Sequence, residues 1–437
     1  MIDFRYQGNV RISQTRMEAF FEHLENYRVY LEHVADKHTY DDPESSFNVP
    51  FDDAIEDEVR EVADKLKTKS LKYVFVVGIG GANLGTKAVY DALGGHYDAL
   101  KPTKPKPQLI FLDTPSPDLF AQIGDIIAKL KTANEFAVNV ISKSGGTTET
   151  LFNVEVLMSL LRKKVGAKAD TRLVVTTQEN SPLWKDAHKR KLHTLKHPSV
   201  GGRYSVFTQV GLFPLLLAGI DIEQLRKGAR DMRTHCLSEG DENIAMASAV
   251  GLYSNFLEGI SIHDSFFFAP HLHSIGLWYR QLMGESIGKE QNRDGQIIHA
   301  GMTPTVSIGS NDLHATLQLY LGGPRDKITT FVWCIDETKD ISMPKKRLFP
   351  SVVPMIDDRT AEEVLSAILE GTKIAYKKAG LPFMEAIFET IDAYSVGEFL
   401  QFKMLEMMYL GYLLNVNAFD QPAVEGYKRE TKNLLGD

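Results

Sequence analysis

Short apolar runs alternate with longer segments of helical periodicity through the first half of the chain. Four such runs are rich in β-branched and aromatic residues and precede helix-like stretches: Tyr73–Val77, Leu109–Leu112, Phe136–Ile141 and Leu173–Thr176. Runs that are apolar at nearly every position are typical of parallel strands covered by helices on both faces. The pattern therefore predicts an α/β domain.

The same alternation restarts after a mostly helical passage from Gln209 to Leu257. The 437 residues exceed the roughly 250 to 300 at which a single core stops growing, so we expect two domains. We place an N-terminal helical segment at 1–50, a first domain at 51–208, a second at 209–415 and a C-terminal helix at 416–437. The second domain is expected to have strands at Phe266–Ala269, Thr305–Ile308, Ile328–Ile335 and Phe383–Glu389, and the last helices at Val396–Leu414 and Ala423–Leu435.

Composition narrows the functions open to the chain. Its 57 acidic and 49 basic side chains give a net charge of −8, which disfavours nucleic acid as a partner. The most apolar run, Gly211–Leu217, is far shorter than the roughly 20 residues that cross a bilayer, so we expect no membrane-spanning segment. Cys236 and Cys334 lack the spacing of a disulfide framework or a zinc site. With charges throughout the N-terminal stretch, we expect a cytoplasmic protein.

A glycine-rich segment, GIGGANLG at Gly78–Gly85, directly follows the first predicted strand. Glycines between a strand and a helix let backbone N–H groups approach an anion or polar ligand closely. The dinucleotide fingerprint G-x-G-x-x-G would need glycine at Asn83, so a dinucleotide site is disfavoured. A tight turn with packing glycines is the alternative interpretation.

A second polar segment, ISKSGGTTET at Ile141–Thr150, also joins a strand to a helix. Its hydroxyls and amides would lie at a helix N-terminus, where the helix dipole favours a dianionic phosphate. The order of a nucleotide-binding P-loop is absent, which favours a phosphate monoester. A simple helix cap would use one hydroxyl and leave the others unexplained.

Two further motifs supply an arginine and a carboxylate. VGGRYS, Val200–Ser205, places Arg203 in a loop directly after two glycines, where its guanidinium can face a developing oxyanion. GESIGKE, Gly284–Glu290, places Glu285 near a helix end, and a proton beside a carbonyl needs a positioned base of this kind. Taken alone, an exposed glutamate is more often an ordinary surface residue.

Two motifs near the end of the chain carry residues that can transfer protons. NDLHATLQLY contains His314 near the start of a predicted helix, and histidine can donate or accept a proton at neutral pH. FDQPAVEGYK contains Lys428 about two turns into the last helix, which starts at a turn with Pro422. Among 13 histidines a lone one is more often a surface residue or a satisfied core residue, and Lys428 alone is compatible with a solvated charge on an amphipathic tail helix.

In this order along residues 78–428, the six segments together resemble the glucose-6-phosphate isomerase family. VGGRYS and GYLLNVNAFDQPAVEGYK, Gly411–Lys428, are similar to two signatures of that family, and the likeness covers nearly the whole chain. The resemblance implies two sugar-isomerase-type (SIS) three-layer α/β/α sandwich domains with mainly parallel five-stranded sheets, and a C-terminal helical tail. It also implies a homodimer that interconverts glucose 6-phosphate and fructose 6-phosphate without a cofactor or a metal.

The resemblance implies a role for each candidate residue. Glu285 would move the proton between C2 and C1, and Arg203 would stabilise the cis-enediol intermediate. Lys428 and His314 would open the hexose ring, with the histidine supplied by the neighbouring subunit. The implied substrate-binding residues are Gly81, Ser142, Lys143, Ser144, Thr147, Gln281 and Gln421.

Other functions remain open from the sequence. A noncatalytic SIS-type regulator that binds a sugar phosphate would share the fold, although no basic DNA-binding segment is visible. An aldose–ketose isomerase specific for a mannose phosphate would share the site. An amidotransferase would need a further glutaminase domain with a catalytic cysteine, for which the chain has no room.

Overall fold

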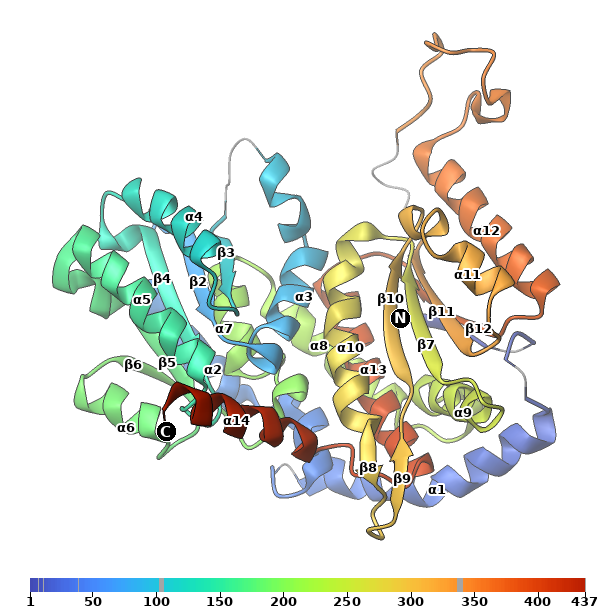
Figure 1. The fold of residues 1–437 in the computed structure, drawn as a ribbon, viewed down its shortest axis with the longest axis horizontal. Coiled ribbons are helices and arrows are strands. Elements are labelled where there is room, and N and C mark those ends of the chain that lie inside the picture. The colour runs from blue at the N-terminus through green and yellow to red at the C-terminus, as the bar shows by residue number, and fades with distance from the viewer. Residues whose placement is uncertain (7, 11, 38, 102–105, 336–340, 437) are drawn as a thin grey trace.

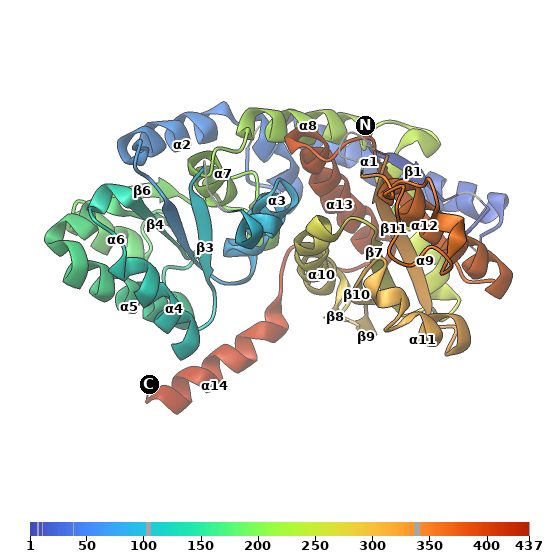
Figure 2. The ribbon, with the colours of Figure 1, turned by 90° about the horizontal axis from the view of Figure 1, so that it is seen from above.

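The computed structural model describes residues 1–6, 8–10, 12–37, 39–101, 106–335 and 341–436. Within these residues the chain forms two five-stranded sheets and one two-stranded hairpin. Helices cover both faces of each larger sheet, and the two sandwiches lie side by side (Figure 1 and Figure 2). The expected class, two α/β/α sandwiches with mainly parallel sheets, is confirmed.

The first sheet has the order β3-β2-β4-β5-β6, and all of its neighbouring strands are parallel. Its strands are buried on both faces, because alternate residues pack against α4 and α5 on one side and α2, α3 and α7 on the other. The strands are β2 (Tyr73–Val77), β3 (Gln108–Leu112), β4 (Phe136–Ile141), β5 (Leu173–Thr177) and β6 (His193–Lys196). The helices are α2 (Asp53–Leu66), α3 (Leu84–Ala92), α4 (Pro117–Ala128), α5 (Thr148–Val165), α6 (Pro182–Lys189) and α7 (Gln209–Leu217).

The second sheet has the order β1-β12-β11-β7-β10, and β1 is antiparallel to its neighbour. Aromatic residues of β7, β11 and β12 pack against α11 and α12 on one face. The strands are β1 (Asp3–Arg5), β7 (Ile262–Phe267), β10 (Thr303–Ile308), β11 (Lys327–Cys334) and β12 (Phe383–Phe388). The helices are α1 (Gln14–Lys37), α8 (Ile222–His235), α9 (Ile244–Leu257), α10 (His273–Ile287), α11 (Leu317–Gly322), α12 (Ala361–Ala379) and α13 (Ala393–Leu413).

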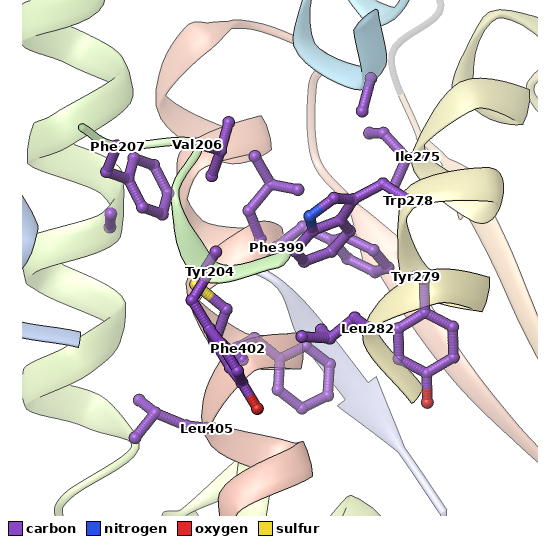
Figure 3. Packing of buried hydrophobic residues seen from close by; sticks show 14 of the residues in the cluster. Tyr204, Val206, Phe207, Ile275, Trp278, Tyr279, Leu282, Phe399, Phe402 and Leu405 are labelled. Atoms are coloured by element: carbon purple, nitrogen blue, oxygen red, sulfur yellow. The ribbon is translucent and has the colours of Figure 1, made fainter. Parts of the chain in front are cut away.

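One hydrophobic cluster runs continuously from the first sandwich into the second. Figure 3 shows its central part, where Tyr204 and its neighbours meet Trp278 of α10 and Phe399 of α13. The indole Nε1 of Trp278 donates to the backbone oxygen of Arg203 over 3.2 Å. The loop that carries Arg203 is therefore packed directly against the helix that carries Glu285.

Two smaller elements extend from the second sandwich. β8 (Lys289–Gln291) and β9 (Ile297–Ala300) form an antiparallel hairpin after α10. The last helix, α14 (Glu425–Leu435), has no buried residue, and Figure 2 shows it standing away from both sandwiches.

A strand is present at each of the expected apolar runs, and the ends differ by at most two residues except in β7. β2 and β4 have the predicted bounds, whereas β7 begins at Ile262 and ends at Phe267 rather than covering Phe266–Ala269. The helical passage before the second sheet comprises α7, α8 and α9. The division of the chain at residues 50, 208 and 415 stays a prediction.

Candidate active site

The glycine-rich turn after β2 packs against the loop that contains Arg203. Gly80 has a φ of +59°, which favours glycine. A Cβ on Gly81 would lie 2.1 Å from the carbonyl carbon of Gly202, so glycine is required by this close approach. The hydroxyl of Ser205 donates to the Gly81 oxygen over 3.3 Å. The packing function proposed as an alternative for these glycines is thus present, and it brings the turn to the edge of the site.

The 142–147 loop joins β4 to α5 and presents several polar groups. The hydroxyls of Ser142 and Thr147 lie 2.9 Å apart, and Ser144 Oγ accepts from the Gly146 N–H over 3.3 Å. Thr147 is the N-cap residue of α5, yet its side chain makes no capping hydrogen bond. The loop therefore offers more polar groups than a helix cap uses, and these can bind an anion at the start of α5.

Lys143 brings a second positive charge close to Arg203. Burial lowers the pKa of the Lys143 ammonium, and the nearby Arg203 guanidinium lowers it further. The glycine-rich turn approaches the start of the 142–147 loop at Gly78, where a Cβ would lie 3.2 Å from the backbone oxygen of Ile141. The glycine-rich turn, the 142–147 loop and the arginine loop are thus neighbours at one end of the first sheet.

Arg203 is 2% exposed, and its guanidinium is surrounded by acceptors. Nη1 donates to Gln421 Oε1 over 2.8 Å and to Glu285 Oε2 over 3.1 Å. Nη2 donates to the backbone oxygens of Ala418 and Asp420, over 2.6 Å and 3.1 Å. A buried cation needs such partners, and these bonds fix the orientation of the guanidinium.

Arg203 also bonds a residue next to the candidate base, which its sequence motif did not single out. Nε of Arg203 donates to Ser286 Oγ over 2.9 Å, and the same oxygen lies 2.9 Å from the hydroxyl of Tyr204. Ser286 lies within GESIGKE, but nothing in the sequence indicates that it would meet an arginine 83 residues earlier.

Glu285 lies in the last turn of α10, with 30% of its side chain exposed. Its Oε1 accepts from Gln281 Nε2 over 3.0 Å, one helical turn earlier. Its Oε2 accepts from Arg203 over 3.1 Å. The carboxylate is therefore oriented from two sides and still reaches solvent, which suits a base that meets a small substrate.

Two predicted catalytic residues lie apart from this group. His314 is exposed and follows a 3₁₀ turn at Asn311–Leu313. Lys428 is exposed on α14, where its Nζ lies 2.7 Å from Glu425 Oε1. Among the described residues, neither makes a hydrogen bond or ion pair with Arg203 or Glu285.

The structure thus brings together one set of the predicted residues. Gly81, Arg203, Gln281, Glu285 and Gln421 belong to one contact network, and Ser142, Lys143, Ser144 and Thr147 form the adjoining loop. In the part of the chain that the structure describes, no group of three or more His, Cys, Asp or Glu side chains is arranged to hold a metal ion. None of the described helices is long and apolar enough to span a bilayer.

Two parallel-sheet sandwiches with a fixed arginine beside a positioned carboxylate define an α/β enzyme equipped for acid–base chemistry. The phosphoglucose isomerase family model matches residues 42–436, and the chain belongs to that family. It is 36% identical to the glucose-6-phosphate isomerase of Carboxydothermus hydrogenoformans over 389 residues, covering 87% of this chain and 82% of the relative. It is 33% identical to that of Streptococcus agalactiae over 384 residues, covering 86% and 83%.

Solved structures share the whole architecture. A hypothetical protein from Thermus thermophilus superposes with a TM-score of 0.83 at 28% identity, and the match covers 100% of both chains. A glucose-6-phosphate isomerase from Chlamydia trachomatis gives a TM-score of 0.82 at 20% identity, covering 100% of this chain and 88% of that one. The second likeness concerns the fold alone.

Proposed function

We propose that this chain interconverts glucose 6-phosphate and fructose 6-phosphate through ring opening and a cis-enediol intermediate. The observation that carries the proposal is the Arg203–Glu285 pair, a buried cation 3.1 Å from a partly exposed carboxylate. Relatives at 33% to 36% identity are named for this activity.

A coupled assay for fructose 6-phosphate conversion, run with a chelator present, tests the proposal. We expect turnover in the ordinary enzymatic range, about 1 to 10³ s⁻¹, that the chelator does not change. Binding of the hexose phosphate without conversion would instead support the noncatalytic regulator.

The proton transfer is assigned to Glu285. In the open-chain aldose the proton on C2 is adjacent to the C1 carbonyl, and its removal by the carboxylate leaves an enediolate. The hydroxyl proton then moves from O2 to O1, and the protonated Glu285 returns its proton to C1, which gives the ketose. General base catalysis of this kind contributes about 10² to 10⁴-fold.

Stabilisation of the oxyanion is assigned to the positive charge of Arg203, which acts through space because its five N–H donors already have acceptors. Its guanidinium is fixed by neighbouring acceptors before any substrate arrives, so little reorganisation is needed when negative charge develops. The low exposure of the cation strengthens its interaction with an oxyanion, because few water molecules compete.

Binding of the nonreacting phosphate is assigned to the 142–147 loop. Ser142, Ser144 and Thr147 supply hydroxyls, and Lys143 supplies a half-buried cation close to Arg203. Binding energy gained there can hold C1 and C2 in register with Glu285. Gly81, Gln281 and Gln421 are proposed to contact the sugar.

Ring opening is assigned to Lys428 and His314, with His314 supplied by a second subunit. The proposal is supported by the exposed position of His314, which leaves it accessible to another chain. Lys428 lies on a helix without buried residues, so few packing contacts oppose its approach to the sugar.

A homodimer is part of the same proposal. An arm at residues 341–360 projects from the second sandwich (Figure 1) and exposes Leu348 by 85% and Phe349 by 67%. At its base is a cavity of about 460 Å³, lined by Ser310 and the apolar side chains of Ile341 and Leu365 among others. Apolar exposure of this kind favours association, and Ser310 is four residues from His314.

A cytoplasmic location also belongs to the proposal. It rests on the two cysteines in 437 residues, a content typical of proteins from reducing compartments.

A further inference from the structure

Lys289 lies where the helix that carries Glu285 ends. The Gly288 N–H donates to the Gly284 oxygen over 3.1 Å, and Lys289 begins β8. A Cβ on Gly288 would lie 2.5 Å from the Gly284 oxygen, so this tight exit requires glycine. After it the Lys289 side chain turns back toward the helix end, where only 6% of it is exposed.

The ammonium group of Lys289 has three acceptors. Nζ donates to the backbone oxygen of Glu285 over 2.7 Å and to the backbone oxygen of Asp420. It also lies 3.0 Å from Asp420 Oδ1. The Glu285 oxygen is one of the last four helix carbonyls, which lack intrahelical donors, and a cation at this end also matches the helix dipole. Lys289 thus caps the C-terminal end of α10 and attaches this end to the C-terminal segment of the chain.

The same C-terminal segment is held by Arg203. Its Nη2 donates to the Asp420 oxygen over 3.1 Å, so two buried cations share one carbonyl. The next residue, Gln421, accepts from Arg203 Nη1 over 2.8 Å. Upstream, Arg293 of the hairpin loop bonds the backbone oxygens of residues 415 and 416. The stretch 415–421 is therefore fixed between the end of α10 and the arginine loop.

We propose that Lys289 is a positioning residue for the isomerisation. Its ammonium joins the carbonyl end of α10 to Asp420, and so holds Glu285, Arg203 and Gln421 in one arrangement before the sugar phosphate binds. The inference rests on the roles proposed for Glu285 and Arg203.

This assignment differs from a binding role. The Nζ donors of Lys289 are directed to two backbone oxygens and one carboxylate, so Lys289 affects the sugar only through its neighbours. Misplacement of a base by about 1 Å can cost about 10²-fold in rate, so the effect falls on turnover rather than on affinity.

Lys289→Met removes the ammonium and keeps the length of the side chain. We expect kcat to fall by about 10- to 100-fold while KM stays within about threefold. Lys289→Arg keeps a charged donor and should restore kcat to within about fivefold of the original chain.

Lys327→Met is the matched control. Lys327 is also buried, and its Nζ donates to the Pro324 oxygen over 3.0 Å and pairs with Asp326. It packs over the ring of Tyr320, on the face of the second sheet away from α10. This variant and Lys289→Met should both lose thermal stability, but Lys327→Met should keep kcat within about twofold.

A kcat for Lys289→Met within twofold of the original chain, or a fall no larger than that of Lys327→Met, would overturn the inference. If Lys289→Met does not fold, Asp420→Ala removes one acceptor at a half-exposed site. It should lower kcat at least threefold at constant KM, and an unchanged kcat would again overturn the inference.

Glu285→Gln distinguishes a failure of the proposed base from a failure of the positioning role. If that variant keeps its turnover, the assignment of the base fails. If it is inactive while Lys289→Met is fully active, only the positioning role of Lys289 fails.

Discussion

Arg203 and Glu285 are 82 residues apart in the sequence, yet Nη1 of the arginine lies 3.1 Å from Oε2 of the glutamate. The pair joins the arginine loop after the first sheet to a helix of the second sandwich. Both sides of the contact are fixed by further bonds, because the arginine donates to Ser286 and Gln421 and Gln281 donates to the glutamate. The two sandwiches thus contribute complementary halves of the proposed acid–base site.

Replacing Glu285 by glutamine should reduce kcat by about 10² to 10⁴-fold, because the amide cannot accept the carbon-bound proton. The affinity for a hexose phosphate should change little, since the amide keeps the size of the carboxylate. Glu290→Gln is the control, because Glu290 is an exposed residue of the same motif. Steady-state kinetics of the two variants check this, and equal turnover in both would contradict the role of Glu285.

The double variant Ser144→Ala, Thr147→Ala should weaken binding of sugar phosphates by about tenfold or more, because each lost hydroxyl removes a hydrogen bond to a charged group worth about 1.5 to 3 kcal/mol. Ser159→Ala serves as the control, since Ser159 is exposed on the same helix. Calorimetric titration with sorbitol 6-phosphate, which has no carbonyl to isomerise, measures the effect. Equal affinities for the double variant and the control would remove the 142–147 loop from the phosphate site.

Gly81→Ala should destabilise the fold by about 1 to 3 kcal/mol and lower activity, because the new Cβ would lie 2.1 Å from the Gly202 carbonyl carbon. Gly124→Ala is the opposite case. Gly124 lies inside α4, where an added Cβ would have nothing within 4 Å, so alanine there should stabilise by about 0.5 to 1 kcal/mol. Chemical unfolding compares them, and destabilisation of the same size in both would show that the close approach at Gly81 is not the cause.

Glu398 makes the stability of the protein depend on pH. Burial raises the pKa of this carboxyl to about 7, above its usual 4.5, although a hydrogen bond from Tyr394 opposes the rise. The folded state therefore keeps a proton that the unfolded chain releases between these two values. The stabilising contribution is complete below about pH 4.5 and is lost as the pH rises through 7.

Glu398→Gln removes this titration while keeping the shape of the side chain. The free energy of unfolding of the variant minus that of the original chain should be larger at pH 8 than at pH 5. Free energies of unfolding at the two pH values check the prediction. A difference between the chains that does not change with pH would show that Glu398 titrates normally.

Much of the fold could be predicted from the sequence because its central strands are continuous apolar runs. The predicted bounds of β2 and β4 are correct for this reason. The apolar pattern does not indicate β6, because the edge strand His193–Lys196 is mostly polar, or β1, because its three residues depend on pairing with β12. These elements are stabilised by contacts distant in sequence, which local patterns do not report.

The candidate site could be predicted as a set of residues but not as a geometry. Motifs identified Arg203 and Glu285, whereas the acceptors at the backbone of Ala418 and Asp420 have no signal in side-chain chemistry. The family resemblance implied a role for Lys428 in ring opening, and the structure places this lysine beside Glu425 on an exposed helix. Its place in catalysis depends on a contact with the sugar, which no pattern within the chain reports.

The most direct test follows the reaction of glucose 6-phosphate in deuterated water by NMR. Proton transfer through Glu285 and an enediolate predicts that part of the fructose 6-phosphate carries deuterium on C1, because the carboxyl proton can exchange with solvent before it returns. The Glu285→Gln variant should give almost no labelled product. Product formed at the original rate without any deuterium, or unchanged labelling in the variant, would contradict the account.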